Sequence, residues 1–157
     1  MITRMTKLIV LGLSMLMLAM AADLPSKKYL NLAAIKAMVA TAEAEMQKRG
    51  VHVTICIVDD GGNILFLQKG DQTTLNTVGF AEKKAKYAAI YGRPSKVAAD
   101  ALKAGNLIGL VAPDSFPNQG GVPIKVDGQT IGAMACSGAA SEVDEAIAQA
   151  AIDALLK

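Results

Sequence analysis

A stripe of aromatic and basic side chains is the feature of this chain best suited to binding a ligand. Phe80, Lys84, Tyr87 and Tyr91 follow one another at three- and four-residue steps, so they share one face of a helix. A tyrosine phenolate is a hard anionic ligand for ferric iron. Aromatic rings, however, also dominate cores and subunit interfaces. From these residues alone we favour packing as the role of the stripe, with Tyr87 as the first position to test for a ligand.

Only one imidazole is available to this chain. His52 is the sole histidine, and on an alternating strand it would share a face with Thr54, Cys56 and Val58. A histidine without a second ligand at metal-binding spacing is more often an edge or hydrogen-bonded polar residue, so His52 ranks second for iron. The sequence contains no nucleophile elbow, phosphate loop or metalloprotease motif. We therefore expect no catalytic residue, and an enzymatic role is not favoured.

Paired glycines precede a strand and admit two interpretations. Gly120 and Gly121 stand before Val122 and Pro123. They could allow the backbone to approach a neighbour closely, with the proline at a strand start or edge. Their N–H groups could instead form a nest for an anion. The residues leave both interpretations open.

Four helical segments are expected to position these side chains. Asn31 is a good N-cap for the first helix, and Gly50 and Gly92 are expected to end the first two in the left-handed conformation. Ser141 is expected to cap the last helix, with Asp144 completing an imperfect capping box. The predicted segments are 32–49, 75–91, 95–104 and a last one that begins at residue 141.

Five strands are predicted between these helices, which gives the order α-β-β-α-α-β-β-β-α. Hairpins are indicated by the Asp/Gly/Asn turn at 59–63 and by Asp127-Gly128. Asp59 and Asp60 would project to opposite faces of a strand, so they suit a turn better than paired acid–base chemistry. The fold class is therefore α/β (α+β), an antiparallel five-stranded sheet packed with helices. The predicted strands are 51–58, 64–67, 107–111, 122–126 and 129–136.

Residues 1–21 have the pattern of a signal peptide. Arg4 and Lys7 precede the apolar run 8–18, and Ala19-Met20-Ala21 supplies a small-x-small cleavage site. The run is short for a membrane span, which needs about 20 apolar residues, so an uncleaved anchor is the less favoured alternative. We expect export to the periplasm or secretion, with residues 22–157 as a single domain.

Loss of this segment changes the charge of the chain. Arg4 and Lys7 leave with it, which takes Lys+Arg from 16 to 14 and balances the 14 acidic residues. A neutral mature chain offers no argument for nucleic-acid binding. Cys56 and Cys136 both fall in predicted strands. A disulfide between them stays open, although burial as free thiols is favoured.

Several segments resemble the GlcG/HbpS-like haem-binding family. They cover essentially the whole chain from residue 30 onwards, and the third is the most specific. The matching segments are 58–65 (VDDGGNIL), 82–89 (EKKAKYAA), 120–124 (GGVPI) with 127–133 (DGQTIGA), and 137–138 (SG). The chain departs from the family pattern at 68–71 (QKGD), where an Arg-Met-Asp-like stretch is usual, and at Tyr87, where many relatives have threonine.

The resemblance implies a PAS/profilin-like fold, frequent homo-oligomers such as octamers, and haem as a ligand of some members. A secreted relative is a redox-linked accessory of a sensor kinase. By this resemblance Tyr87 would face the iron, with the lone histidine as the alternative ligand. Lys83 and Lys84 would meet the haem propionates, and Phe80 and Tyr91 would stack on the porphyrin.

Three functions follow as hypotheses. The leading one is an exported binding protein for haem or a related tetrapyrrole, acting as carrier, scavenger or redox sensor, assembled through its Ala-rich helices and the Gly-Gly-Val-Pro region. The second, suggested by the glycolate operons of some relatives, is an enzyme or accessory for a small organic acid, held by Lys84, Lys86 and the Gly120-Gly121 amides. The third is a structural oligomer that binds a protein partner.

Overall fold

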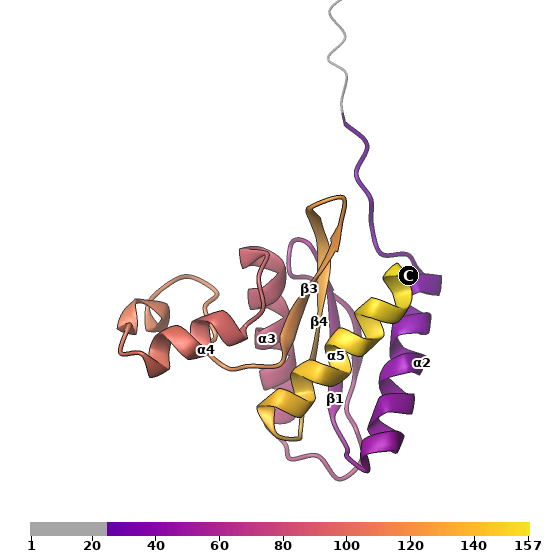
Figure 1. The fold of residues 1–157 in the computed structure, drawn as a ribbon, viewed down its shortest axis with the longest axis horizontal. Coiled ribbons are helices and arrows are strands. Elements are labelled where there is room, and N and C mark those ends of the chain that lie inside the picture. Colours follow the sequence, from indigo (N-terminus) through magenta and orange to yellow (C-terminus); the bar gives the residue numbers. More distant parts are fainter. Residues whose placement is uncertain (1–24) are drawn as a thin grey trace, which may run out of the picture.

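Four antiparallel strands form the central sheet of residues 25–157, the part of the chain that this computed structural model describes (Figure 1). They are β1 (Thr54–Asp59), β2 (Ile64–Gln68), β3 (Gly121–Val126) and β4 (Gln129–Ser137), in the spatial order β2-β1-β4-β3. Both predicted hairpins, β1–β2 and β3–β4, are confirmed. The predicted signal peptide, residues 1–21, lies outside the described residues and stays a prediction.

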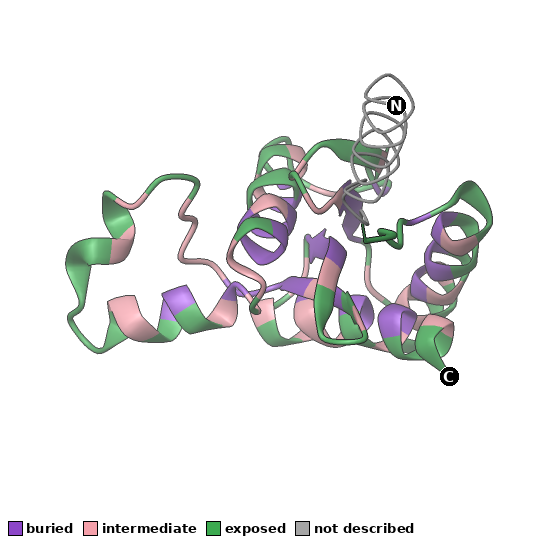
Figure 2. Cartoon of the chain, turned by 90° about the horizontal axis from the view of Figure 1, so that it is seen from above, coloured by how far each residue is buried: buried purple, intermediate pink, exposed green. Residues whose placement is uncertain are grey.

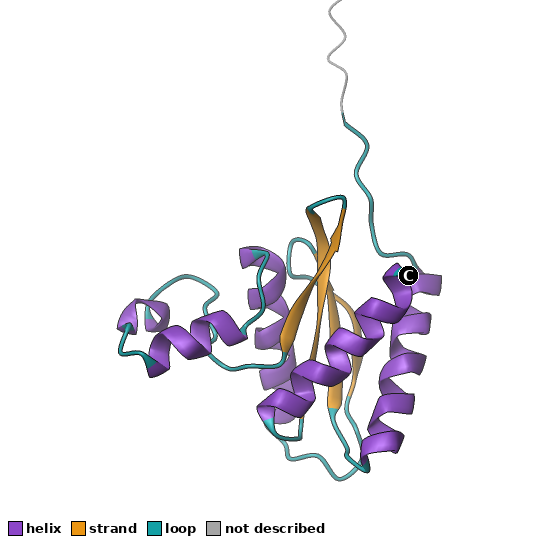
Figure 3. Cartoon of the chain, viewed as in Figure 1, coloured by secondary structure: helices purple, strands orange, loops and turns teal. Residues whose placement is uncertain are grey.

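Helices cover both faces of this sheet. They are α2 (Leu32–Arg49), α3 (Thr77–Tyr91), α4 (Lys96–Lys103) and α5 (Ser141–Leu156). α2 and α5 pack side by side on one face, and α3 packs on the other (Figure 3). α4 and the short 3-10 helix η2 (Leu107–Leu110) project away from the sheet. None of the helices in residues 25–157 is long and apolar enough to cross a membrane.

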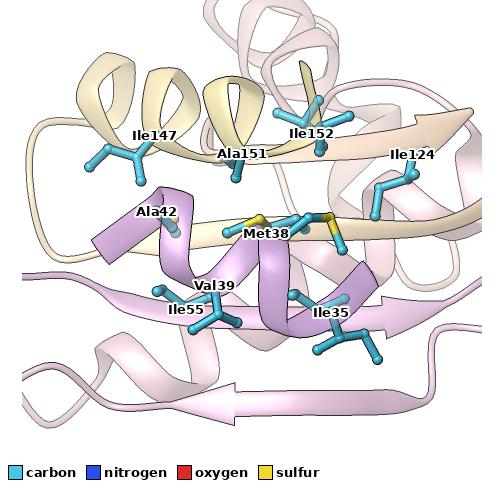
Figure 4. Packing of buried hydrophobic residues seen from close by; sticks show 14 of the residues in the cluster. Ile35, Met38, Val39, Ala42, Ile55, Ile124, Ile147, Ala151 and Ile152 are labelled. Atoms are coloured by element: carbon cyan, nitrogen blue, oxygen red, sulfur yellow. The ribbon is translucent and has the colours of Figure 1, made fainter. Parts of the chain in front are cut away.

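The two faces of the sheet bury different kinds of side chain. Between the sheet and α2/α5 lies a core of large aliphatic residues such as Met38, Ile55 and Ile147 (Figure 4). On the α3 side the buried residues are mostly alanines, including Ala81, Ala85, Ala88, Ala133 and Ala135. Small side chains let α3 lie close to the strands, so the helix that carries Tyr87 is held firmly.

The predicted strand 107–111 is wrong. Leu107–Leu110 forms η2, whose N-cap Asn106 accepts a hydrogen bond from the Ile108 N–H at 3.1 Å. The segment lies on the arm, residues 96–112, which projects away from either edge of the sheet, so it has no strand to pair with. The sheet has four strands instead of five, and the PAS/profilin-like five-stranded arrangement is not confirmed. The mixed α/β class is confirmed.

Three of the expected helix caps form and one does not. The Asn31 side chain accepts from the Ala34 N–H, and Gly50 and Gly92 end α2 and α3 with φ of 64° and 59°. Ser141 instead lies inside the first turn of α5, after Ala140 at the cap. Asp144 does not take part in a capping box with Ser141, because its Oδ1 accepts the Ala139 N–H and its Oδ2 pairs with a lysine of α3.

Strand register keeps the two cysteines apart. In the β1–β4 ladder Cys136 lies opposite Ile55, and Cys56 lies opposite Ala135. Because neighbouring residues alternate faces, Cys136 belongs to the α2/α5 core and Cys56 to the α3 core. Both are free thiols. Burial raises the pKa of Cys56 to about 12, and it raises the pKa of Cys136 further.

Candidate functional site

The predicted aromatic and basic stripe does not form one site. The alanines of α3 contact the sheet, and the stripe residues point to three separate places around the helix. Tyr87 and Tyr91 line a pocket beneath the arm, Lys84 reaches the start of α5, and Phe80 packs on Phe116 in the loop before β3.

Tyr87 lies at the wall of a pocket between α3, α4 and η2. Its side chain is only 1% exposed and stacks on Tyr91, with ring centroids 4.6 Å apart and planes 21° from parallel. Arg93 Nε donates a hydrogen bond of 2.9 Å to the Tyr87 hydroxyl oxygen. The pocket measures about 190 Å³ and is lined mainly by apolar groups, among them Val97 and Ile108. A phenol, a guanidinium and apolar walls therefore meet at one place.

Arg93 is the residue of this pocket that the sequence interpretation missed. Its guanidinium carbon lies 5.8 Å from the Tyr87 ring centroid and 5.3 Å from that of Tyr91. It follows Gly92, whose left-handed conformation ends α3 and turns the chain back toward the last turn of the helix. The signal that could have located Arg93 in the sequence is its position directly after the glycine expected to end this helix.

Lys84 is buried away from this pocket. It is 2% exposed, and its Nζ lies 3.0 Å from Asp144 Oδ2 and 3.2 Å from the Cys136 carbonyl oxygen. Burial raises the pKa of the Asp144 carboxyl, and the Lys84 charge offsets only part of that effect. The expected contact of Lys84 with a propionate beside Tyr87 would require this ion pair to open.

The paired glycines pack against Lys84. A Cβ added to Gly121 would lie 2.2 Å from the Lys84 carbonyl oxygen, and one added to Gly120, whose φ is 130°, would lie 2.9 Å from Lys84 Nζ. The Gly121 N–H donates to Ser95 Oγ at 2.9 Å. Close approach of β3 to α3 thus accounts for these glycines, while the anion nest stays a prediction with one amide already engaged.

Phe80 and Lys83 gather around Phe116, which lies in the loop before β3. The Phe80 and Phe116 rings meet edge to face with centroids 5.2 Å apart, and Lys83 Nζ lies 5.6 Å from the Phe116 centroid. Neither residue lines the Tyr87 pocket. Their expected roles on a porphyrin remain untested.

His52 lies near the other end of α3. It is exposed, two residues before β1 begins, and lines an open depression of about 600 Å³ with Lys69 and Asp71. The Thr54 and Thr77 hydroxyls, 2.8 Å apart, place the start of β1 at the first turn of α3. Tyr87 is roughly 15 Å further along that helix. His52 and Tyr87 therefore cannot ligate the same iron in this arrangement, and residues 25–157 hold no cluster of three or more His, Cys, Asp or Glu side chains suited to a metal.

The comparison with protein families settles which family has this architecture. The family described as "Haem degrading protein HbpS-like" matches residues 30–153. The chain is an HbpS-like protein. Its relatives include the protein GlcG of Escherichia coli strain K12, which is 33% identical over 112 residues, covering 71% of this chain and 84% of GlcG.

Solved structures share the fold of this HbpS-like protein. The Klebsiella pneumoniae protein ORFY superposes with a TM-score of 0.79 at 26% identity, covering 88% of this chain and 98% of ORFY. A PduOC:haem complex superposes with a TM-score of 0.74 at 26% identity, covering 81% of this chain and 95% of PduOC. The predicted family is thereby confirmed.

Proposed function

We propose that this HbpS-like protein binds haem or a related tetrapyrrole. The observation that carries the proposal is the likeness of nearly the whole PduOC chain, which was crystallised as a haem complex, to this fold. The family description names haem as well. Binding is the activity proposed, because the PduOC neighbour was crystallised with haem bound.

The chemistry of the Tyr87 pocket fits such a ligand. A tyrosine oxygen is an established axial ligand of haem iron, which supplies redox chemistry when it is bound. Arg93 can pair with a propionate while keeping its place over the two tyrosine rings. Apolar walls from α4 and η2 suit the porphyrin edge. Tyr87, Arg93 and Tyr91 are therefore the residues that would hold the group.

The size of the pocket requires the arm, defined as residues 96–112, to move. At about 190 Å³ the pocket lies below the roughly 300 Å³ typical of the smallest ligand sites. The arm is held at both ends by hydrogen bonds. Just before it, the Ser95 N–H donates to the Gly121 carbonyl oxygen. Just after it, the Tyr91 hydroxyl donates a hydrogen bond of 2.6 Å to the Pro113 carbonyl oxygen. Between these ends α4 packs mainly on η2. Displacement of the arm would widen the pocket without disturbing the sheet.

A spectroscopic titration tests this function. Hemin added to the purified apoprotein should give a shifted Soret band that saturates at a fixed stoichiometry. Arg93→Ala should weaken binding by roughly ten- to a hundredfold, because it removes a charged hydrogen bond worth about 1.5–3 kcal/mol. A hemin spectrum identical to that without protein would contradict the proposal.

We also propose that the protein forms a homo-oligomer, with the arm as the contact surface. Part of the expected surface is closed off, because the alanines of α3 and the paired glycines are buried inside the single chain, whereas Ala33, Ala37 and Ala40 of α2 are exposed. The arm instead consists mostly of exposed and half-buried residues, drawn green and pink in Figure 2. Leu107, Ile108, Leu110 and Val111 are 59–81% exposed. A second copy of the chain would cover them.

Export is proposed on the pattern of residues 1–21. It would place haem binding in the periplasm or outside the cell, where a carrier, a scavenger or a redox-linked partner of a sensor protein could act. Intact-mass measurement of the protein from the periplasmic fraction should give an N-terminus at Ala22. A full-length chain found only in membranes would indicate an uncleaved anchor instead.

A further inference from the structure

Glu145, in the second turn of α5, carries a buried oxygen that has no hydrogen-bond donor. The residue is half-buried. In the described part of the chain, residues 25–157, its Oε2 is the one buried side-chain nitrogen or oxygen that makes no hydrogen bond. Buried polar atoms are normally bonded, and a charged oxygen loses most when it lacks a donor. The ionised carboxyl is therefore poorly accommodated in this arrangement.

The charged groups that face Glu145 come from α4, at the base of the arm, and from α5 itself. They are Lys96 and Asp100 of α4 and Glu142 of α5, joined by the Gln119 side chain from the segment before β3. Lys96 does not supply the missing donor, because its ammonium pairs with Asp100 inside α4. The base of the arm thus presents Glu145 with a cation that already has a partner and with a second carboxylate.

The balance of these effects favours the protonated form of Glu145. Burial raises its pKa above the ordinary value of 4.5, and the charges of Asp100 and Glu142 act in the same direction. The Gln119 hydrogen bond and the Lys96 charge act to lower the pKa but do not outweigh burial. A neutral carboxyl tolerates an unbonded oxygen at smaller cost than a carboxylate does.

Displacement of the arm would change this balance. Ser95, directly before α4, is fully buried and exchanges two hydrogen bonds with Gly121 of β3, so it fixes the point about which the arm can turn. Asp100 lies about one helical turn further along α4 than Lys96 and would move away from Glu145 as α4 swings. Water would then reach Oε2 and favour the ionised carboxyl. The two positions of the arm would therefore differ in their affinity for one proton.

We propose that Glu145 is a proton-sensitive latch at the base of the arm. The closed arm favours the neutral carboxyl, and the displaced arm favours the carboxylate. The latch acts on ligand binding only if the proposed function holds, since it is the Tyr87 pocket that needs the arm to move before a tetrapyrrole can enter. Binding would then release a proton from Glu145.

The sign of the pH dependence follows from this linkage. Below the ordinary value of 4.5 both positions of the arm carry the protonated carboxyl, so the affinity for the tetrapyrrole does not change there. Between that value and the raised pKa of the closed form, only the closed arm holds the proton, so a rising pH favours displacement and binding. Above the raised pKa the contribution is complete.

Measurements on the purified apoprotein test the latch without any ligand. In carbon NMR of the side-chain carboxyl groups, the resonance that Glu145→Gln removes should titrate above 4.5, and Asp100→Asn should lower that pKa. Hydrogen exchange of the α4 amides, corrected for the intrinsic effect of pH, should be slower at acidic than at neutral pH. Glu145→Gln should keep the slow exchange at both and unfold at or above the wild-type Tm. A Glu145 pKa at or below 4.5, or α4 exchange independent of pH, would overturn the proposal.

Hemin titrations link the latch to the binding site. Glu145→Gln imitates the neutral carboxyl, so it should bind hemin roughly two- to fivefold more weakly than wild type at neutral pH and lose most of the pH dependence. Glu142→Gln is the matched control, because it removes the same charge from an exposed position of α5, and it should keep a pH profile close to that of wild type. Equal pH profiles for wild type and Glu145→Gln would refute the latch. Failure of every variant to bind hemin would refute the proposed function alone, since the apoprotein measurements decide the latch independently.

Discussion

The two cysteines show how strand register controls the chemistry of single residues. They lie on adjacent strands but on opposite faces of the sheet, each in a closed core. Because a thiolate is the reactive form, the raised pKa values of Cys56 and Cys136 make both thiols unreactive in the folded protein.

Thiol labelling checks this consequence. The native protein should not react with Ellman's reagent at neutral pH over minutes, and two thiols per chain should react once it is unfolded in guanidinium. Both thiols of the unfolded chain should react without prior reduction, because Cys56 and Cys136 form no disulfide. Rapid labelling of the native protein, or a mass two hydrogens lower before reduction, would be inconsistent with the strand register.

Asp59 stabilises the turn between β1 and β2. Burial acts to raise its pKa, but hydrogen bonds from the Asn63 side chain and N–H outweigh it and lower the pKa. The Asn63 N–H lies 2.8 Å from Asp59 Oδ1. Asp59→Ala should cost about 1–3 kcal/mol of unfolding free energy. Asp60→Ala is the matched control with a smaller cost, since Asp60 makes only a surface pair with Lys27.

The pH dependence of this effect has a definite sign. Because the folded pKa of Asp59 lies below its ordinary value of 3.8, its contribution is complete above that value and disappears as the pH falls through the folded pKa. Denaturant unfolding should therefore show the wild-type and Asp59→Ala proteins converging in stability at strongly acidic pH. A difference that is constant from neutral to acidic pH would refute the role of the carboxylate.

At the scale of elements, two glycines give opposite predictions. An added Cβ at Gly121 in β3 would strike the Lys84 backbone, whereas one at Gly79 in α3 would meet nothing within 4 Å. Gly121→Ala should destabilise the fold by about 1–3 kcal/mol or more through overpacking. Gly79→Ala should stabilise it by about 0.5–1 kcal/mol through helix propensity. Thermal unfolding of both variants compares them directly, and equal effects would contradict the close approach of β3 to α3.

Local patterns were sufficient to predict most elements. Asn31, Gly50 and Asp127-Gly128 act through their own backbone neighbourhood, so cap and turn chemistry located them. The 107–111 segment has the apolar composition of a strand, but a strand also needs a partner, and the arm provides none. Ser141 is not the cap because α5 begins with Ala140 at the cap position, and Asp144 is held instead by Lys84, sixty residues away.

The candidate site depended still more on distant contacts. Tyr87 lines a pocket, and its role as a ligand stays a prediction. Helical spacing alone could not show that Lys84 pairs with α5 or that Phe80 packs on Phe116. Those contacts join segments that meet only in the folded chain. Arg93 completes the pocket from outside the helix and so lay outside the periodic pattern.

For the whole molecule, the exposed arm is the feature that a single chain leaves unexplained. Val111, in this arm, is 81% exposed. If a second copy covers the arm, Val111→Lys should shift the oligomer toward monomer in light scattering coupled to size exclusion, with secondary structure by circular dichroism unchanged. Leu75, 93% exposed but outside the arm, provides the control, and Leu75→Lys should leave the mass unchanged. A monomeric wild-type protein at micromolar concentration would contradict this assembly.

Haem binding at the Tyr87 pocket is tested most directly by Soret spectra of three hemin-titrated proteins side by side. Wild type and His52→Ala should give the same shifted band and the same affinity, because His52 lies at the far end of α3. Tyr87→Phe removes the phenolic oxygen and should alter the band and weaken binding at least tenfold. Identical spectra and affinities for wild type and Tyr87→Phe, or a spectrum lost in His52→Ala, would contradict the assignment.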